Sequence, residues 1–271
     1  MAEKDLIDST SSPATVESLK RDLAALGVQP GMLLLVHSSL SALGWVNGGP
    51  VAVILALEEL LGPQGTLVMP THTGDLSDPR QWQNPPIPES WWETVLASMP
   101  AYDPWLTPTR MMGVISETFR KQGGVMRSEH PQFSFAAWGA QAEAILADHN
   151  LHYGLGEGSP LARIYEHAGW VLLLGVDHSN NTSLHLSEYR AQYPAKNTTR
   201  NGAPIKVGQL RQWVEILDIN LNADDFRSIG ADFCKTTGLE QEGKVGLATA
   251  RLMPQKALVD FGVAWMEQHR T

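Results

Sequence analysis

The chain has 271 residues, of which 43% are hydrophobic and 18% are charged. That length allows one large domain with a substantial core over residues 1–271, and the composition is that of a folded enzyme rather than a disordered or membrane-embedded chain. The 20 basic and 29 acidic residues give a net charge of −9. An acidic balance disfavours nucleic acid as the main partner and attracts a cationic small molecule.

The cellular location is indicated by cysteine usage and by the N-terminus. Cys234 is the only cysteine, so no internal disulfide can form. Residues 1–12 are polar and are predicted to form a flexible leader rather than a signal sequence. The longest apolar runs, 32–36 and 170–176, are far shorter than the roughly 20 residues that span a bilayer. The sequence therefore predicts a cytoplasmic protein with no membrane segment.

Hydrophobic periodicity alternates between helix and strand along most of the chain. Apolar residues three or four apart predict a helix over 16–26, which Thr15 can cap and Gly27 can end. Helices that alternate with buried apolar strands indicate an α/β sandwich. The same patterns predict strands over 32–36, 66–69, 170–176, 212–219 and 245–253, and helices over 51–61, 112–121, 141–148, 159–167, 180–192 and 255–268.

Two parts of the chain depart from this regular alternation. Residues 71–109 are rich in Pro and Trp, and a loop of that length in a compact domain is usually a lid or a binding loop. Residues 196–271 differ in composition, because seven acidic and two basic residues lie within 212–243. This C-terminal portion is predicted to form one wall of a cleft, on the substrate side.

Polar residues follow the first predicted strand directly. His37, Ser38, Ser39 and Leu40 come after the apolar run 32–36. Ligands of α/β proteins collect at the carboxyl ends of strands, where backbone N–H groups and hydroxyls bind phosphate, carbonyl or thioester oxygens. The alternative interpretation is an ordinary polar turn that caps a helix.

A histidine and a carboxylate share one face of the helix predicted over 180–192. Asn180 or Asn181 can cap this helix and Pro194 stops it. His185 and Glu188 are three residues apart, so their side chains are neighbours. A histidine takes up a proton near neutral pH, and a carboxylate can orient its ring. The alternative is a simple intrahelical ion pair.

Metal binding is an alternative for a chain with nine histidines. His149 and His152 are three residues apart, and His178 and His185 flank the end of a strand. No H-E-x-x-H motif occurs, which disfavours a catalytic metal. A metal-dependent hydrolase that uses His37, His178 and His185 is the corresponding alternative function.

Two other enzyme classes lack their motifs in this sequence. A serine hydrolase needs a G-x-S-x-G elbow, and the nearest string, at 156–160, does not match it. The glycine-rich nucleotide fingerprints are also missing. Ligand binding by loops at strand ends remains the favoured interpretation.

A set of segments occurs in a fixed order along nearly the whole chain. They are LLLVHSSLSALGWVNGG at 33–49, GTLVMPTHTGD at 65–75, PPIPESWW at 85–92, RSEHPQFSFAAWG at 127–139, GEGSPLARIYEHAGWVLLLGV at 156–176, NTSLHLSEYRA at 181–191 and GLATARLMPQKALVDF at 246–261. Together they resemble the aminoglycoside 3-N-acetyltransferase family, whose fold is distinct from that of the GNAT acetyltransferases. The resemblance implies a three-layer sandwich with a central mixed sheet flanked by helices, and a long Pro/Trp-rich loop insertion.

The resemblance also implies a reaction and a set of residues for it. Acetyl-CoA is the implied co-substrate and no metal is expected. His185 is the implied general base, Glu188 its acidic neighbour, and His37 lies near the reacting centre. The implied coenzyme-binding residues are Ser38, Ser39, Leu40, Arg110, Met112, Gly113, Val114, Ser128 and Ser134. Backbone N–H groups or hydroxyls around Ser38, Ser39 or Thr182 could stabilise the thioester oxyanion, and the sequence does not choose among them.

Carboxylates suit a polycationic aminosugar substrate. By resemblance, Glu215 and Asp218 are the best acceptor-binding positions, with Asp75 as a weaker one. Asn220 stands where some relatives have an acid, a departure that bears on which aminoglycosides are accepted. Ser187 stands where the usual residue is Ala.

The expected function is acetylation of the 3-amino group of the 2-deoxystreptamine ring of aminoglycoside antibiotics, which gives resistance. The expected partners are the aminoglycoside and acetyl-CoA, without nucleic acid or membrane, and a homodimer is compatible with the sequence. The alternatives are an acetyltransferase for another amine, the metal-dependent hydrolase, and a pure binding protein.

Overall fold

A mixed sheet of seven strands forms the centre of the protein in the computed structural model, which describes residues 3–271. The strands are β1 (Leu33–Ser38), β2 (Thr66–Pro70), β3 (Met126–Arg127), β4 (Phe135–Gly139), β5 (Trp170–Leu174), β8 (Gln241–Val245) and β9 (Ala248–Pro254). Their order is β3-β4-β2-β1-β5-β9-β8. β1 pairs in parallel with β2 and β5, while the outer pairings are antiparallel.

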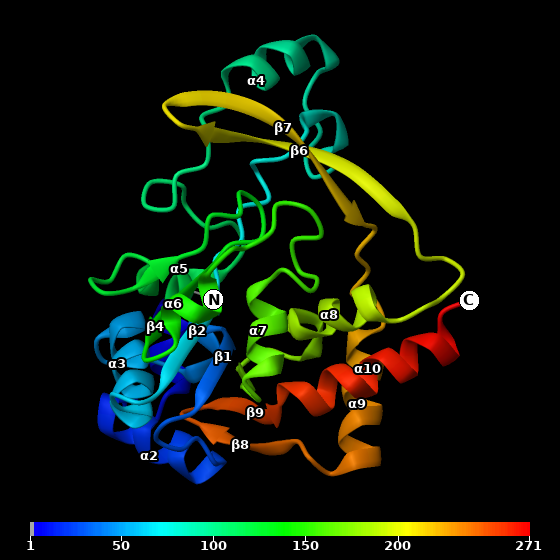
Figure 1. Ribbon diagram of the computed structural model, residues 1–271. Helices are drawn as coiled ribbons and strands as arrows, with labels where there is room; N and C mark the ends of the chain where they lie inside the picture. The colour runs from blue at the N-terminus through cyan, green and yellow to red at the C-terminus, as the bar shows by residue number, and fades with distance from the viewer. Residues whose placement is uncertain (1–2) are drawn as a thin grey trace.

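Helices cover both faces of the sheet (Figure 1). On one face lie α2 (Val16–Leu26), α3 (Gly49–Leu61) and α5 (Gly113–Phe119); on the other lie α6 (Ala142–Leu146), α7 (Pro160–Glu166), α8 (Ser183–Arg190), α9 (Phe226–Thr237) and α10 (Gln255–His269). Successive strand side chains point to opposite faces, so Leu34 and Val36 pack with the first group and Leu33 and Leu35 with the second. The predicted three-layer α/β sandwich is confirmed.

A separate hairpin and a short helix lie together away from the central sheet. The hairpin joins β6 (Thr198–Val207) to β7 (Leu210–Ile219), and α4 (Trp92–Ser98) lies beside it at the top of Figure 1. Arg211 in β7 donates to the carbonyl oxygen of Met99 just beyond α4, at 2.6 Å. The segment 71–109, predicted as a long loop, therefore contains a helix and packs against a hairpin.

The N-terminal region differs from the predicted flexible leader over 1–12. Residues Glu3–Ser9 form helix α1, and Met1 and Ala2 lie outside the described residues. The backbone N–H of Trp45 donates to Thr10 Oγ1 at 2.9 Å, which ties this region to the body. Such a contact joins residues 35 apart, so local composition cannot reveal it.

The predicted strand over 245–253 is in fact a hairpin. β8 and β9 flank a turn at Gly246, whose φ of 55° suits glycine. The structure also contains β3, β4, β6 and α9, which the sequence patterns do not predict. β6 carries the polar string TTRNG over 198–202, which lacks apolar alternation. Within residues 3–271, no helix is both long and apolar enough to cross a bilayer.

Candidate active site

A cavity of about 430 Å³ opens at the carboxyl ends of the parallel strands. Because β1, β2 and β5 are parallel, these ends meet at one edge of the sheet, where ligands of α/β proteins bind. The register places Ser38 beside Leu174, at the last residues of β1 and β5. The cavity is lined by Leu6, His37, Ser38, Ser39, Leu40, Ser41, Pro70, Met111, Met112, Gly113, Val114, Ser116, Val176, Asn180 and Thr182.

His37 is a buried imidazole at this edge. It follows Leu33 and Leu35 on the face of the sheet that packs against α7 and α8, so it points toward the helix that carries His185. Burial, and then the nearby His185, lower the pKa of His37 to about 3. Its Nε2 atom has no hydrogen-bond partner and the residue is only 5% exposed. His37 is therefore a neutral ring with an unused polar atom.

His185 and Glu188 form a close pair on α8. His185 Nδ1 lies 2.5 Å from Glu188 Oε2, and Glu188 is fully buried. The ring of His185 packs edge-on against Phe226, with 4.8 Å between ring centroids. A carboxylate on Nδ1 fixes the tautomer with its proton there. The Nε2 lone pair is then free to accept a proton.

His72 is a third imidazole in this region, and the sequence patterns do not single it out. It follows β2 and packs edge-on against Phe133 and Phe135. Burial, and then the neighbouring His185 and His37, hold its pKa well below the usual value. Its Nε2 atom also has no hydrogen-bond partner. Its position just after β2, within the segment 65–75 that resembles the family, is the sequence signal that could have located it.

The structure brings most of the predicted coenzyme-binding residues together. Ser38 at the end of β1, Ser39 and Leu40 directly after it, and the start of α5 line the same cavity. The residues at the start of α5 are Met112, Gly113 and Val114. The hydroxyl of Ser38 is buried without a partner. Because an unpaired buried hydroxyl is unfavourable, a ligand that hydrogen-bonds there would relieve that cost.

Arg110 and Asp75 lie in a neighbouring cavity of about 420 Å³ instead. Their side chains form an ion pair. Met111, whose side chain is 89% exposed, lines both cavities. A residue predicted for coenzyme binding and one predicted for acceptor binding are thus in direct contact in the wall of the second cavity.

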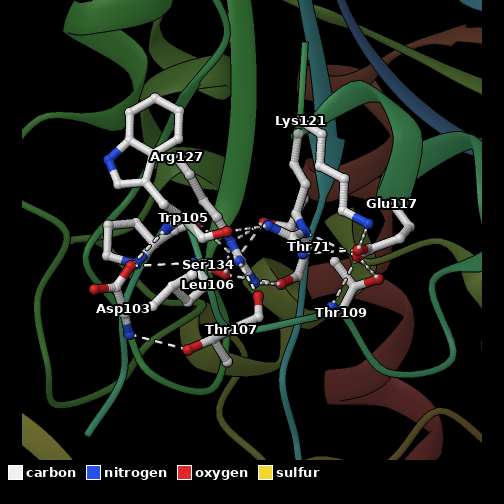
Figure 2. A network of polar contacts seen from close by, with 12 residues as sticks. Thr71, Asp103, Trp105, Leu106, Thr107, Thr109, Glu117, Lys121, Arg127 and Ser134 are labelled. Atoms are coloured by element: carbon white, nitrogen blue, oxygen red, sulfur yellow. Dashed lines mark hydrogen bonds and ion pairs between the residues drawn. The ribbon is translucent and has the colours of Figure 1, made fainter.

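Ser128 and Ser134, predicted near the coenzyme, are buried away from the cavity. Ser134 donates to the carbonyl oxygen of Thr71 at 2.8 Å and accepts from Arg127 Nε at 3.1 Å. Arg127 also donates to the carbonyl oxygen of Thr107 at 2.6 Å, and Figure 2 shows its guanidinium between these groups. Ser128 accepts from the N–H of Phe135 at 3.0 Å. The Ser134 hydroxyl therefore binds segment 71–109 at Thr71, and the Ser128 hydroxyl also contacts His149 Nδ1 at 2.9 Å.

The predicted acceptor-binding residues on and after β7 have different surroundings. Asp218 is buried and accepts from Tyr189 Oη, from the N–H of Ile219 at 2.7 Å and from the N–H of Gly154 at 3.3 Å. Burial raises the pKa of Asp218. Glu215 is exposed and pairs with Arg200, and Asn220 is exposed. Asp218 is therefore fully used by the protein itself.

Replacing Asp218 with Asn is expected to lower the free energy of unfolding by about 1–3 kcal/mol. An Asn side chain that keeps its oxygen toward Tyr189 turns an N–H donor toward the N–H of Gly154. Glu215→Gln is the matched control and is expected to change stability by less than about 0.5 kcal/mol. Chemical denaturation measures both, and equal stability of Asp218→Asn and wild type would show that these contacts contribute nothing.

The three histidines of the metal-dependent alternative do not converge. His178 Nε2 lies 2.7 Å from Glu240 Oε2, in another cavity of about 410 Å³ that Cys234 also lines. Throughout residues 3–271, no group of three or more His, Cys, Asp or Glu side chains is placed to hold a metal ion.

A histidine with a carboxylate at one ring nitrogen, near a cavity, is an arrangement suited to moving a proton during group transfer or hydrolysis. The family model for aminoglycoside 3-N-acetyltransferases matches residues 35–267. The SPbeta prophage-derived aminoglycoside N(3')-acetyltransferase-like protein of Bacillus subtilis (strain 168) is 46% identical over 97% of this chain and 96% of that protein. The chain belongs to the aminoglycoside 3-N-acetyltransferase family, a family of acyltransferases.

Solved structures agree with this assignment. AAC-IIIb in a binary complex with CoASH has a TM-score of 0.85 and 35% identity, over 96% of this chain and 98% of that one. A mutant of the aminoglycoside acetyltransferase AAC(3)-IVa in complex with a gentamicin has a TM-score of 0.80 and 33% identity, over 96% and 91% of the two chains.

Proposed function

We propose that the protein transfers the acetyl group of acetyl-CoA to the 3-amino group of the 2-deoxystreptamine ring of an aminoglycoside, with His185 as general base. The observation that carries this proposal is the His185–Glu188 pair, which leaves Nε2 free near the cavity that His37 lines. The CoASH and gentamicin complexes of similar proteins support both ligand classes.

His185 acts on the proton of the attacking amine. As the amine nitrogen forms its bond to the acetyl carbon, Nε2 takes the proton that the nitrogen loses. The carbon–sulfur bond then breaks, and His185 returns the proton to the departing thiolate. Glu188 stabilises the imidazolium between these two steps. The ring ends the cycle neutral, so no other acid or base is required.

Donors for the oxyanion come from the end of β1. A ring nitrogen of His37 and the hydroxyl of Ser38 are buried without partners. A histidine whose pKa is about 3 is neutral at pH 7, so it can donate an N–H bond without carrying charge. Backbone N–H groups beside Ser39 or Thr182 remain the alternatives.

The acceptor side is formed by the second cavity and the hairpin. Asp75 is exposed in the cavity next to the first one, and Glu215 is exposed on β7. Carboxylates form charge-assisted hydrogen bonds with the ammonium groups of an aminoglycoside, and the net charge of −9 favours its approach. Acetylation would remove a positive charge from the drug and thereby confer resistance.

The test is to incubate the protein with acetyl-CoA and a panel of aminoglycosides and to weigh the products. A gain of one acetyl group on a 2-deoxystreptamine drug, located by NMR on the 3-amino nitrogen, is expected. Reactions without acetyl-CoA serve as the control. Acetylation of other amines only would refute the acceptor, and absence of any transfer would refute the proposed activity.

A further inference from the structure

Glu188 has a second charged partner besides His185. Arg270 follows α10 directly, and its Nη1 lies 2.6 Å from Glu188 Oε1. The N–H of Asn222 donates to the same oxygen at 2.9 Å. The Arg270 side chain is only 11% exposed, and that of Glu188 is fully buried. Arg270 lies outside the stretch that the family model matches, which ends at 267.

Arg270 is itself held on several sides. Its Nε and Nη2 lie 2.7 Å from the two carboxylate oxygens of Asp225, and Nη2 also donates to the carbonyl oxygen of Asn222 at 2.8 Å. The guanidinium carbon lies 5.2 Å from the centre of the Tyr193 ring. A planar guanidinium with this many partners has one orientation. Glu188 is thereby presented to His185 by a rigid group.

We propose that Arg270 is a positioning residue for acetyl transfer: it orients Glu188 toward His185 Nδ1 and balances the charge of that carboxylate. This inference rests on the proposed function, because it assigns His185 the role of base. Without Arg270, the buried carboxylate of Glu188 would face His185 with its negative charge uncompensated.

The charged groups around the pair are few. His37 on β1, His72 after β2 and Asp218 on β7 face His185. The two histidines have lowered pKa values because they are buried, so they carry no charge near pH 7. Asp218 is engaged by Tyr189 and two backbone N–H groups.

The groups around Glu188 leave Arg270 as the cation in contact with it. Lys196 affects Glu188 electrostatically, but its ammonium group donates to the carbonyl oxygens of Tyr189 and Ala191. Tyr189 and Tyr193 are phenols whose pKa values are raised, first by burial, so they are neutral. Asp225 is the remaining anion, and it binds Arg270 rather than Glu188.

Arg270→Gln is expected to move the acid limb of the pH–rate profile about one unit to higher pH, because loss of a nearby cation makes the His185–Glu188 pair hold a proton more tightly. At pH 7, kcat is expected to fall by up to about tenfold, since one pH unit is a factor of ten in protonation. The KM for acetyl-CoA is expected to stay within about twofold, since Arg270 touches neither cavity.

The experiment pairs kinetics with NMR titration of the His185 ring in the free protein. Arg270→Lys keeps the charge without the planar fork and should show only part of the shift that Arg270→Gln produces. Arg227→Gln on α9 is the matched control, because it breaks an exposed Arg–Asp pair with Asp177 and should move neither readout. If Arg270→Gln does not fold, the double variant Arg270→Gln with Asp225→Asn removes both members of the pair.

The outcomes separate this inference from the proposed function. A shift of the His185 titration to higher pH in the folded Arg270 variants, and not in Arg227→Gln, supports the positioning role. An unchanged titration and an unchanged acid limb in a folded Arg270→Gln protein would overturn it. Absence of acetyl transfer by the wild type would refute the proposed function, while the NMR titration would still decide the link from Arg270 to His185.

Discussion

Replacing His185 with Gln is expected to lower kcat for acetyl transfer by about 10²- to 10⁴-fold, the usual cost of losing a general base. An amide side chain fills much of the ring's space but accepts no proton at neutral pH. The affinity for CoA is expected to change little, because His185 does not line the cavity where the predicted coenzyme-binding residues gather. Steady-state kinetics and calorimetry with CoA measure the two quantities.

The matched control for this variant is His167→Gln. His167 is exposed directly after α7, and it lines neither cavity of the candidate site. Its replacement should leave kcat unchanged. Retention of more than half of the wild-type kcat by His185→Gln at saturating substrates would contradict the assignment of the base.

The His185–Glu188 contact could be predicted because it is local. Residues three apart on a helix are neighbours whatever the rest of the fold does, and α8 spans both of them. The cavity at the end of β1 follows from a second local rule, since the apolar run before His37 reveals a buried strand whose end must reach the sheet edge.

Burial of polar side chains could not be predicted in the same way. Asp218 has the composition of a ligand-binding acid, yet Tyr189 and Gly154, which are 29 and 64 residues away, use its oxygens. Ser134 is likewise used by Thr71, which is 63 residues away. A sequence pattern shows that a polar group is present, but only the tertiary structure shows whether its hydrogen bonds are free.

The residues around His185 that the sequence patterns do not predict all reach it through long-range contacts. Phe226 packs on the ring of His185 from α9, His72 approaches from the end of β2, and Arg270 approaches from beyond α10. None has a motif of its own. The proposed catalytic pair is therefore local in sequence, whereas the groups that surround it come from three distant segments.

Four histidines with lowered pKa values, His37, His72, His130 and His149, predict that the protein loses stability as the pH falls below about 6.5, the pKa of an exposed histidine. Burial lowers the pKa of His37 and His130 to about 3 and that of His149 to about 4. The geometry agrees, since His130 Nδ1 accepts from the N–H groups of Gln132 and Phe133 at 3.0 and 2.9 Å. Protonation of His130 at that atom would break both bonds.

The sign follows from proton binding. Between pH 6.5 and about 4, the unfolded chain binds protons at these histidines that the folded protein does not, so unfolding becomes more favourable as the pH falls. Each such proton contributes about 1.4 kcal/mol per pH unit, so His37, His130 and His149 give up to about 4 kcal/mol per unit and His72 adds up to about 1.4 kcal/mol more. Denaturation at pH 7.5, 6.5, 6 and 5.5 measures the slope, and His149→Gln should reduce it by about one proton. A free energy of unfolding that stays constant from pH 7 to pH 5 would show that these imidazoles are protonated in the folded protein. That result would also contradict the proposed role of His37 as a neutral hydrogen-bond donor.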